Sequence, residues 1–190
     1  ADETVSSLYS VKSEQATMLS FDTYNYLVHY FGQPQGSMSD DPNGTLGGDY
    51  EFIISSASAE RIELKGKKYG NRIVMKALTE DQTWKQYLTK IKKVEDDAFF
   101  YEYDLLMDGL YTGQMIRSNY TFIVTYYDEI GKVHQKTVPF MFTADGLRFH
   151  EPVTIDGQTM QNFVWKNELI SFVCTDEGAT GVKLAGVYTA

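Results

Sequence analysis

Hydrophobic and polar residues alternate along much of this chain with the two-residue period of a β-strand. The alternation is clearest in three neighbouring stretches, at residues 49–55, 61–65 and 72–77. Short connectors of small or turn-forming residues, at 56–59 and 70–71, separate these stretches. Because alternation interrupted by turn residues is typical of strands that fold back on one another, the pattern predicts an antiparallel meander.

The same alternation predicts strands in the rest of the chain. Turn sequences that contain glycine, at residues 108–109, 129–131, 145–146 and 156–157, separate several of them. The predicted strands span residues 8–21 (one or two strands around a turn at 13–15), 98–107, 111–117, 120–127, 133–142, 159–165 and 168–175. Residues 178–190 are weakly patterned, so no strand is predicted there. About nine or ten strands without alternating helices favour a mainly β fold, an antiparallel barrel or sandwich, and leave a lipocalin-like barrel open.

One amphipathic helix is predicted at about residues 79–94, between two groups of strands. Thr79 and Gln82 have the spacing of a capping box, in which an N-cap hydroxyl and a side chain three residues later satisfy backbone N–H groups. The apolar side chains of this segment form one stripe, made of Trp84, Tyr87, Leu88 and Ile91. The helix is therefore expected to cover or flank the sheet.

A shorter helix is expected at residues 24–31, with Asp22 or Thr23 as its N-cap and Gly32 at its end. A strand is the alternative for this segment. The chain of 190 residues is long enough to bury a core of its own. We therefore interpret residues 1–190 as a single β-rich domain.

The chain is acidic, with 26 acidic residues, 17 basic residues and a formal net charge of −9. Such a protein repels the phosphates of nucleic acids and anionic lipids, so no nucleic acid is expected as a partner. The sequence contains no apolar run of the roughly 18 residues that a membrane-spanning helix needs, so no transmembrane segment is expected.

No motif in the sequence assigns catalysis, metal binding or a cofactor. Cys174 is the only cysteine, which excludes an intrachain disulfide, and its apolar neighbours Phe172 and Val173 predict a buried, inert thiol. The histidines, which lack the spacing of a metal-binding helix, are His29, His134 and His150. The acidic residues between 40 and 49 do not follow the order of a calcium-binding loop. We therefore expect a protein that is not an enzyme and that holds no metal or cofactor.

Aromatic residues make up 14% of the chain. They favour sheet, and they also provide rings on which a ligand can stack. Three tyrosines precede a long loop at residues 33–48 that is rich in glycine and proline. The candidate ligand-binding residues are these tyrosines and one tryptophan: Tyr24, Tyr26, Tyr30 and Trp165. Packing in the core is the alternative explanation for each of them.

Four short blocks carry a resemblance to a known family: Phe21–Asn25, His29–Phe31, Gly48–Phe52 and Leu64–Asn71. In this order and spacing they resemble a family of secreted lipoproteins from Bacteroidetes, a domain-of-unknown-function group, over most of the chain. The resemblance implies a cell-envelope protein, in the periplasm or at the outer-membrane surface, often associated with polysaccharide uptake. It implies no catalytic residues. Since no anchoring cysteine stands at the start of this chain, we expect a part of a longer lipoprotein whose lipid anchor lies outside it.

These observations lead to three hypotheses about function. The first is a non-enzymatic envelope protein that binds a glycan or joins other envelope proteins in an assembly, because aromatic faces suit sugars. The second is a lipocalin-like carrier of an apolar small molecule, if a barrel closes around a cavity. The third is a glycoside hydrolase that acts through dispersed carboxylates, although no motif supports one.

Overall fold

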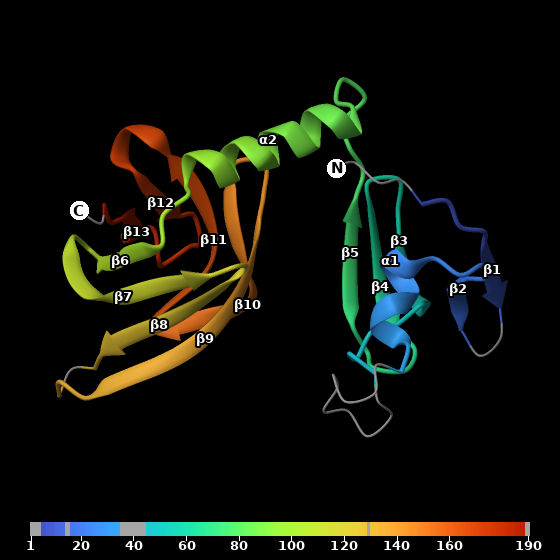
Figure 1. Cartoon of the computed structure of the whole chain (residues 1–190), viewed down its shortest axis with the longest axis horizontal. Helices are drawn as coiled ribbons and strands as arrows, with labels where there is room; N and C mark the ends of the chain where they lie inside the picture. The colour runs from blue at the N-terminus through green and yellow to red at the C-terminus, as the bar shows by residue number, and fades with distance from the viewer. Residues whose placement is uncertain (1–4, 14–15, 35–44, 129, 189–190) are drawn as a thin grey trace. The chain divides into compact units, whose positions relative to one another are not determined.

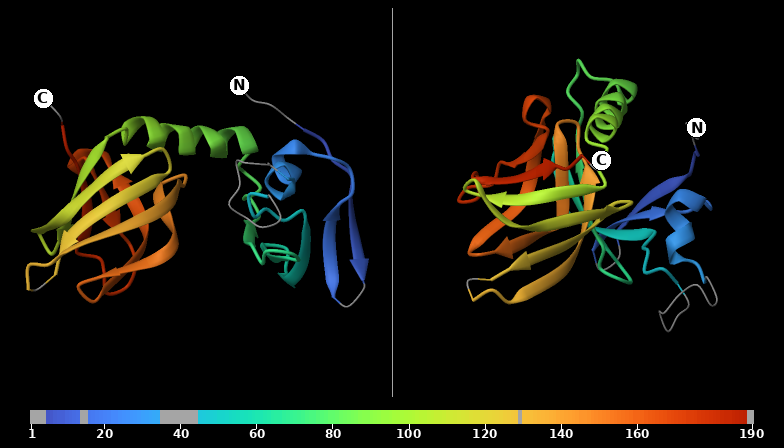
Figure 2. Two further views of the ribbon diagram at one scale, coloured as in Figure 1. Left: turned by 60° about the horizontal axis from the view of Figure 1, so that its bottom comes forward. Right: turned by 60° about the vertical axis from the view of Figure 1, so that its left-hand side comes forward.

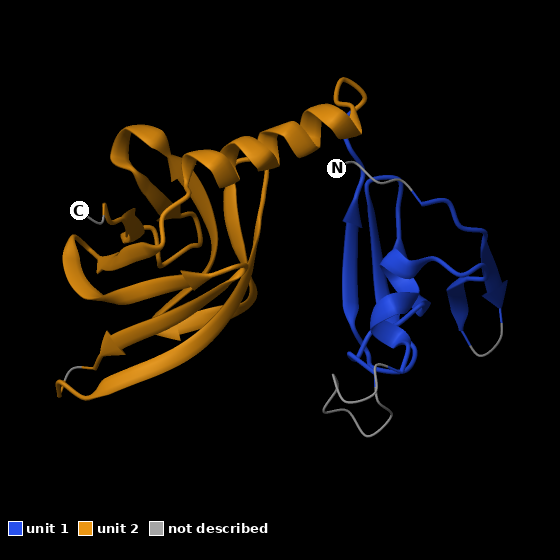
Figure 3. Cartoon of the chain, viewed as in Figure 1, with its two compact units in different colours: residues 1–79 blue, residues 80–190 orange. Residues whose placement is uncertain are grey.

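The chain divides into two compact units, unit 1 (residues 1–79) and unit 2 (residues 80–190) (Figure 3). The computed structural model describes residues 5–13, 16–34, 45–128 and 130–188. From the sequence we expected one β-rich domain with a helix between two strand groups. In the structure each strand group forms a sheet of its own within its own unit.

Unit 1 contains a five-stranded antiparallel sheet whose strands follow one another in chain order (Figure 1). Its strands are β1 (Tyr9–Ser13), β2 (Thr17–Phe21), β3 (Glu51–Ala57), β4 (Arg61–Gly66) and β5 (Arg72–Lys76). The predicted meander is confirmed as β3, β4 and β5. Phe52 pairs with Gly66 and Ile54 pairs with Leu64, so Phe52 and Leu64 share one face, where both are buried.

A short helix of unit 1 lies between β2 and β3, as predicted. It consists of α1 (Tyr26–His29) followed by one 3₁₀ turn, η1 (Tyr30–Gly32). The predicted N-caps Asp22 and Thr23 are wrong, because the side chain of Asn25 accepts the hydrogen bond from the Leu27 N–H at 3.0 Å. The Asp22 carboxylate is occupied elsewhere, since it accepts hydrogen bonds from Lys12 and Ser20.

Unit 2 is an eight-stranded antiparallel barrel (Figures 1 and 2). Its strands are β6 (Glu102–Met107), β7 (Leu110–Ser118), β8 (Thr121–Tyr127), β9 (Val133–Phe142), β10 (Gly146–Ile155), β11 (Gln158–Lys166), β12 (Ser171–Cys174) and β13 (Val182–Gly186). The barrel closes where β13 pairs with β6. The expected mainly β fold is confirmed, and unit 2 is a barrel rather than a sandwich.

Side chains fill the interior of the barrel. The large side chains that are almost completely buried there include Tyr103, Phe122, Phe140, Phe149, Phe163 and Phe172. Many of these rings contact one another; Phe122 and Phe140, for example, stack with their centroids 4.3 Å apart. An eight-stranded barrel is just wide enough to be filled by its own side chains, and this interior is largely aromatic.

The amphipathic helix α2 (Trp84–Asp97) precedes the barrel strands and begins later than the predicted 79–94. The capping box is formed by Thr83 and Gln86, not by Thr79 and Gln82: Gln86 N donates to Thr83 Oγ1, and Thr83 N donates to Gln86 Oε1. The same spacing occurs twice in the sequence, and the second copy directly precedes the apolar stripe.

The stripe of α2 is buried only toward its C-terminal end. Val94 belongs to the barrel core and Ile91 packs against it, whereas Trp84, 67% exposed, and Leu88 do not. Lys92 and Lys93 form ion pairs with Asp96 and Asp97 one turn later on the exposed side. None of the helices that the structure describes is long and apolar enough to cross a membrane.

The end of the chain differs from the prediction. Residues 178–190 were expected to lack a strand, yet they contain β13, and its Val182 and Leu184 are completely buried. The last predicted strand began at 168, but residues 167–169 form a 3₁₀ turn and β12 starts at Ser171. Ile170, between them, adopts a left-handed conformation with φ of 48°, which separates β11 from β12.

Candidate functional site

The predicted tyrosines Tyr24, Tyr26 and Tyr30 lie at or beside α1 in unit 1. The ring of Tyr24 packs on His29 with centroids 5.4 Å apart, and His29 stacks on Tyr50 at 4.8 Å and an interplanar angle of 22°. Tyr24 is 60% exposed and Tyr50 is also exposed, so the outer members of this three-ring stack are open to solvent. We call Tyr24, His29 and Tyr50 the ring stack.

Local hydrogen bonds hold the ring stack in place. His29 Nδ1 lies 3.0 Å from the Asn25 carbonyl oxygen and 3.1 Å from the Asn25 amide nitrogen, which orients the imidazole at the end of α1. The hydroxyl of Tyr24 donates to Gln33 Oε1 at 3.3 Å. Tyr30 and Phe31 add a second, edge-to-face pair of exposed rings with centroids 5.4 Å apart. Unit 1 therefore displays two sets of exposed rings around one short helix.

Trp165 does not belong to this group. It lies on β11 of unit 2, where its ring packs on Phe172 at 4.8 Å and on Phe100 at 6.2 Å, against the barrel core. Its indole Nε1 has no hydrogen-bond partner among the described residues. The alternative explanation, packing in the core, therefore accounts for Trp165.

A buried carboxylate shapes the turn between β4 and β5. Asp49 accepts hydrogen bonds from the backbone N–H groups of Lys68 (2.8 Å), Tyr69 (3.0 Å) and Asn71 (3.3 Å), and from the Asn71 side chain (2.8 Å). Burial raises the pKa of Asp49, but the hydrogen bonds from Tyr69, Lys68 and Asn71 outweigh it and hold the pKa below its usual value. A side chain at Gly66 would place its Cβ 1.9 Å from Asp49 Oδ2, so only glycine fits there.

The segment that carries Asp49 is also tied to α1 and η1. The N–H groups of Leu46 and Gly48 both donate to the carbonyl of Phe31, at 3.0 and 2.9 Å. A Cβ at Gly48 would lie 2.4 Å from the Phe31 Cβ, which explains the glycine. The hydroxyls of Thr45 and Tyr69 share a short hydrogen bond. The sequence blocks His29–Phe31, Gly48–Phe52 and Leu64–Asn71 thus meet in one place.

In the sequence these blocks carry the family resemblance, and Asp49 stands out only as an acidic residue weighed as a calcium ligand. The available signal was the pair of small residues at Gly48 and Gly66 together with the carboxylate at Asp49. Their partners lie about twenty positions away in the sequence, so only the fold brings them together. Asp49 positions the backbone that carries Tyr50 of the ring stack.

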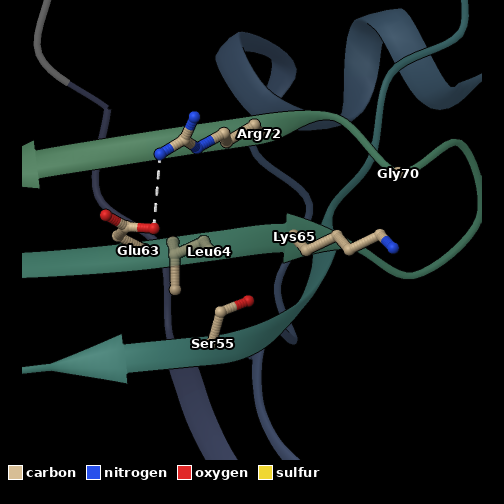
Figure 4. A pocket seen from close by; sticks show the side chains of 6 residues that line it. All are labelled: Ser55, Glu63, Leu64, Lys65, Gly70 and Arg72. Atoms are coloured by element: carbon tan, nitrogen blue, oxygen red, sulfur yellow. Dashed lines mark hydrogen bonds and ion pairs between the residues drawn. The ribbon is translucent and has the colours of Figure 1, made fainter.

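A pocket of about 300 Å³ lies on the β3–β4–β5 hairpins of unit 1 (Figure 4). It is lined by Ser55, Glu63, Leu64, Lys65, Gly70 and Arg72. Ser55 is the extra residue of a β-bulge, since Ile54 pairs with Leu64 but Ser56 pairs with Glu63. In Figure 4 the Arg72 guanidinium is turned toward Glu63, while Lys65 extends toward the Gly70 turn. Sequence reasoning did not single out this pocket.

Asp176 and Cys174 of unit 2 are hydrogen-bonded to each other, with the thiol donating to Asp176 Oδ2 at 3.4 Å. Asp176 accepts hydrogen bonds from the backbone N–H groups of Gln161 (2.6 Å) and Asn162 (2.8 Å). Burial raises the pKa of Asp176, but the hydrogen bonds from Asn162 and Gln161 lower it by more. The pKa is therefore below its usual value, and the carboxyl group stays ionised. The Cys174 thiol is buried, as predicted, and this burial raises its pKa to about 11.

The described residues contain no group of three or more His, Cys, Asp or Glu side chains placed to hold a metal ion. Most of the predicted loop at 33–48, with its acidic residues at 40 and 41, lies outside the described part of the chain. Asp49, the last of the acidic residues weighed as calcium ligands, accepts hydrogen bonds from three backbone N–H groups and from the Asn71 side chain.

Comparison with known proteins gives one match. Residues 1–167 match the profile of DUF4302, a domain of unknown function. No curated protein and no solved structure matches the chain. The matched residues include all of unit 1, the helix α2 and the barrel strands β6 to β11. The chain therefore belongs to the DUF4302 family.

Proposed function

We propose that this chain is a non-enzymatic protein of the cell envelope whose unit 1 binds a glycan through the ring stack. The single observation that carries the proposal is the stacked Tyr24–His29–Tyr50 arrangement with exposed outer rings. Aromatic faces favour the flat, C–H-rich faces of sugar rings, and ordered rings lose little side-chain entropy when a ligand binds.

The surroundings of the ring stack support a preformed binding surface. His29 is oriented by Asn25, and the backbone before Tyr50 is tied down by the Asp49 hydrogen bonds. Tyr30 and Phe31, which directly follow His29 in the chain, provide a second pair of exposed rings in the same unit. Exposed apolar patches are typical of binding regions.

The other two hypotheses receive less support from the structure. A lipocalin-like carrier needs a cavity in the barrel, but buried rings such as Phe122, Phe140 and Phe172 fill that interior. A glycoside hydrolase needs one carboxyl group that stays protonated as a general acid. Asp49 and Asp176, both held by backbone N–H groups, instead have pKa values below the usual range.

A thermal-shift screen tests glycan binding. Neutral and acidic polysaccharides and oligosaccharides are added to the intact chain, and we expect at least one class to raise the melting temperature, because a ligand that binds only the folded state stabilises it. Tyr24→Ala should abolish that shift. Tyr9→Ala is the matched control, since Tyr9 lies in the same unit and is 67% exposed, close to the 60% of Tyr24, but is outside the ring stack.

Two results would contradict the proposal. One is a screen in which no glycan raises the melting temperature of the intact chain. The other is a glycan shift that Tyr24→Ala leaves unchanged or that Tyr9→Ala removes equally. The envelope location, which rests on the family resemblance, is tested separately by fractionating source cells with an antibody to this chain. We expect the chain in the envelope fraction, and its recovery in the cytosolic fraction would refute that location.

A further inference from the structure

The pocket on the β3–β4–β5 hairpins contains more positive than negative charge. Lys65 and Arg72 are directly paired across β4 and β5, so their side chains leave the same face of the hairpin. Glu63 is the single acidic residue in the lining. Lys65 has no ion pair among the described residues of the chain.

The charge of Glu63 is already neutralised from outside the pocket. Arg61 donates to its carboxylate twice, at 2.9 Å from Nε and 2.6 Å from Nη2, and these hydrogen bonds lower the pKa of Glu63. The second contact of Glu63, with Arg72, is longer at 3.4 Å. Arg72 therefore keeps most of its donors available. Its guanidinium is turned toward Glu63, and the Lys65 ammonium group extends toward the Gly70 turn at the other end of the pocket (Figure 4).

We propose that this pocket binds a sugar acid, with Arg72 as the cationic donor to its carboxylate and with Lys65 and Ser55 as donors to other oxygens of the ring. The guanidinium of arginine matches a carboxylate with two parallel hydrogen bonds. The volume of about 300 Å³ lies at the small end of the range for ligand pockets, which fits one ring rather than a long chain. The choice of a sugar acid over other small anions rests on the proposed glycan-binding function.

The position of the pocket supports a built site rather than two stray surface cations. The bulge at Ser55 adds one residue to β3 and redirects its side chain toward the lining of the pocket. Gly70, with φ of 77°, turns the chain sharply at the other end, beside the Lys65 stem. The turn itself is held by the Asp49 hydrogen bonds to Lys68 and Tyr69.

An NMR titration of the intact, isotope-labelled chain tests the proposal. Glucuronate is the probe, and glucose and inorganic phosphate are the comparison ligands. We expect glucuronate to shift the amide signals of Leu64 and Gly70, and glucose to leave them unchanged. Lys65→Gln and Arg72→Gln should each weaken glucuronate binding by about tenfold, because each removes a charge-assisted hydrogen bond. Lys76→Gln, an exposed cation of β5 outside the pocket, should change it by less than about twofold.

The outcomes separate this proposal from the glycan-binding function. Glucuronate binding that depends on Lys65 but not on Tyr24 supports the pocket, whatever the ring stack does. The proposal would be overturned if glucose and glucuronate bound equally well or if phosphate bound more tightly than glucuronate. It would also be overturned if glucuronate binding survived both pocket substitutions. A glycan shift that requires Tyr24 would remain valid in each of those cases. The amide spectrum of each variant checks that unit 1 remains folded.

Discussion

Removing the Asp49 carboxylate should destabilise unit 1 more than any exposed substitution in it. Asp49 is buried and accepts four hydrogen bonds, three of them from backbone N–H groups of residues 68, 69 and 71. Each hydrogen bond to a charged group contributes about 1.5–3 kcal/mol, and contributions within one cluster do not add fully. We therefore expect Asp49→Ala to lower the free energy of unfolding of unit 1 by about 3–5 kcal/mol.

The conservative change separates charge from shape. Asp49→Asn keeps one acceptor oxygen but places an NH₂ group against donors, so we expect a loss of about 1.5–3 kcal/mol. Because the folded-state pKa of Asp49 lies below the unfolded value of 3.8, its ionisation stabilises the fold above that value. This contribution is lost as the pH falls through the lower folded-state pKa. The difference in stability between the wild type and Asp49→Asn should therefore shrink in that acidic range.

Residue-resolved hydrogen exchange is the suitable assay, because it reports unit 1 separately from the barrel. Protection of the Lys68 and Tyr69 amides, whose hydrogen bonds end on Asp49, should fall in both variants. Glu60→Gln, an exposed acid of the same unit, is the control and should change stability by less than about 0.5 kcal/mol. If Asp49→Ala kept these amides protected and unit 1 as stable as in the control, the reasoning from the hydrogen bonds would be refuted.

Two further predictions concern unit 2. Burial raises the pKa of the Cys174 thiol to about 11, so a thiol reagent at pH 8 should label it only after unfolding in urea. Rapid labelling of the native chain would contradict the burial of the thiol. Thr83→Ala should destabilise α2 by about 1 kcal/mol through loss of the N-cap, whereas Thr79→Ala should have no such effect. Circular dichroism during thermal unfolding compares the two variants. Equal losses of stability would contradict the observed capping box.

Local turn chemistry made much of the fold predictable from sequence. Asp156–Gly157 marks the hairpin between β10 and β11, and both residues adopt positive φ, 45° and 76°, as a tight hairpin turn requires. Asp108–Gly109 does the same between β6 and β7, with φ of 50° and 83°. The strands on both sides of the second turn, β6 and β7, were predicted, whereas β10, which precedes the Asp156–Gly157 turn, was not predicted as a strand.

Features that depend on distant partners could not be predicted in this way. The candidate Tyr24 was identified from its position beside a long loop, but its stack through His29 onto Tyr50 joins residues far apart in sequence. The role of Asp49 depends in the same way on the turn at 68–71. Trp165 looked equivalent to Tyr24 in the sequence, because composition does not distinguish an aromatic residue that packs in a core from one that faces solvent.

The strand β13, like β10, was not indicated by the sequence, and the barrel depends on it. Only five residues long and containing Ala185 and Gly186, it lacks a strong alternation of its own. It is defined by pairing on both sides, with β12 and with β6, almost eighty residues earlier in the chain. Without β13, both neighbouring strands would have an unpaired edge, and the barrel would stay open.

A pair of substitutions in β13 tests this dependence. Leu184 is completely buried in the barrel core, so Leu184→Ala should lower the free energy of unfolding of unit 2 by about 2–5 kcal/mol, through lost apolar burial and the cavity left behind. The adjacent Lys183 lies on the opposite side of the strand and is the matched control, with an expected change of less than about 0.5 kcal/mol for Lys183→Gln. Urea unfolding followed by tryptophan fluorescence measures both, since Trp165 packs on Phe172 within the same core. Equal stability of the two variants would mean that β13 is only loosely attached, and that β6 to β12 hold the unit together without closure.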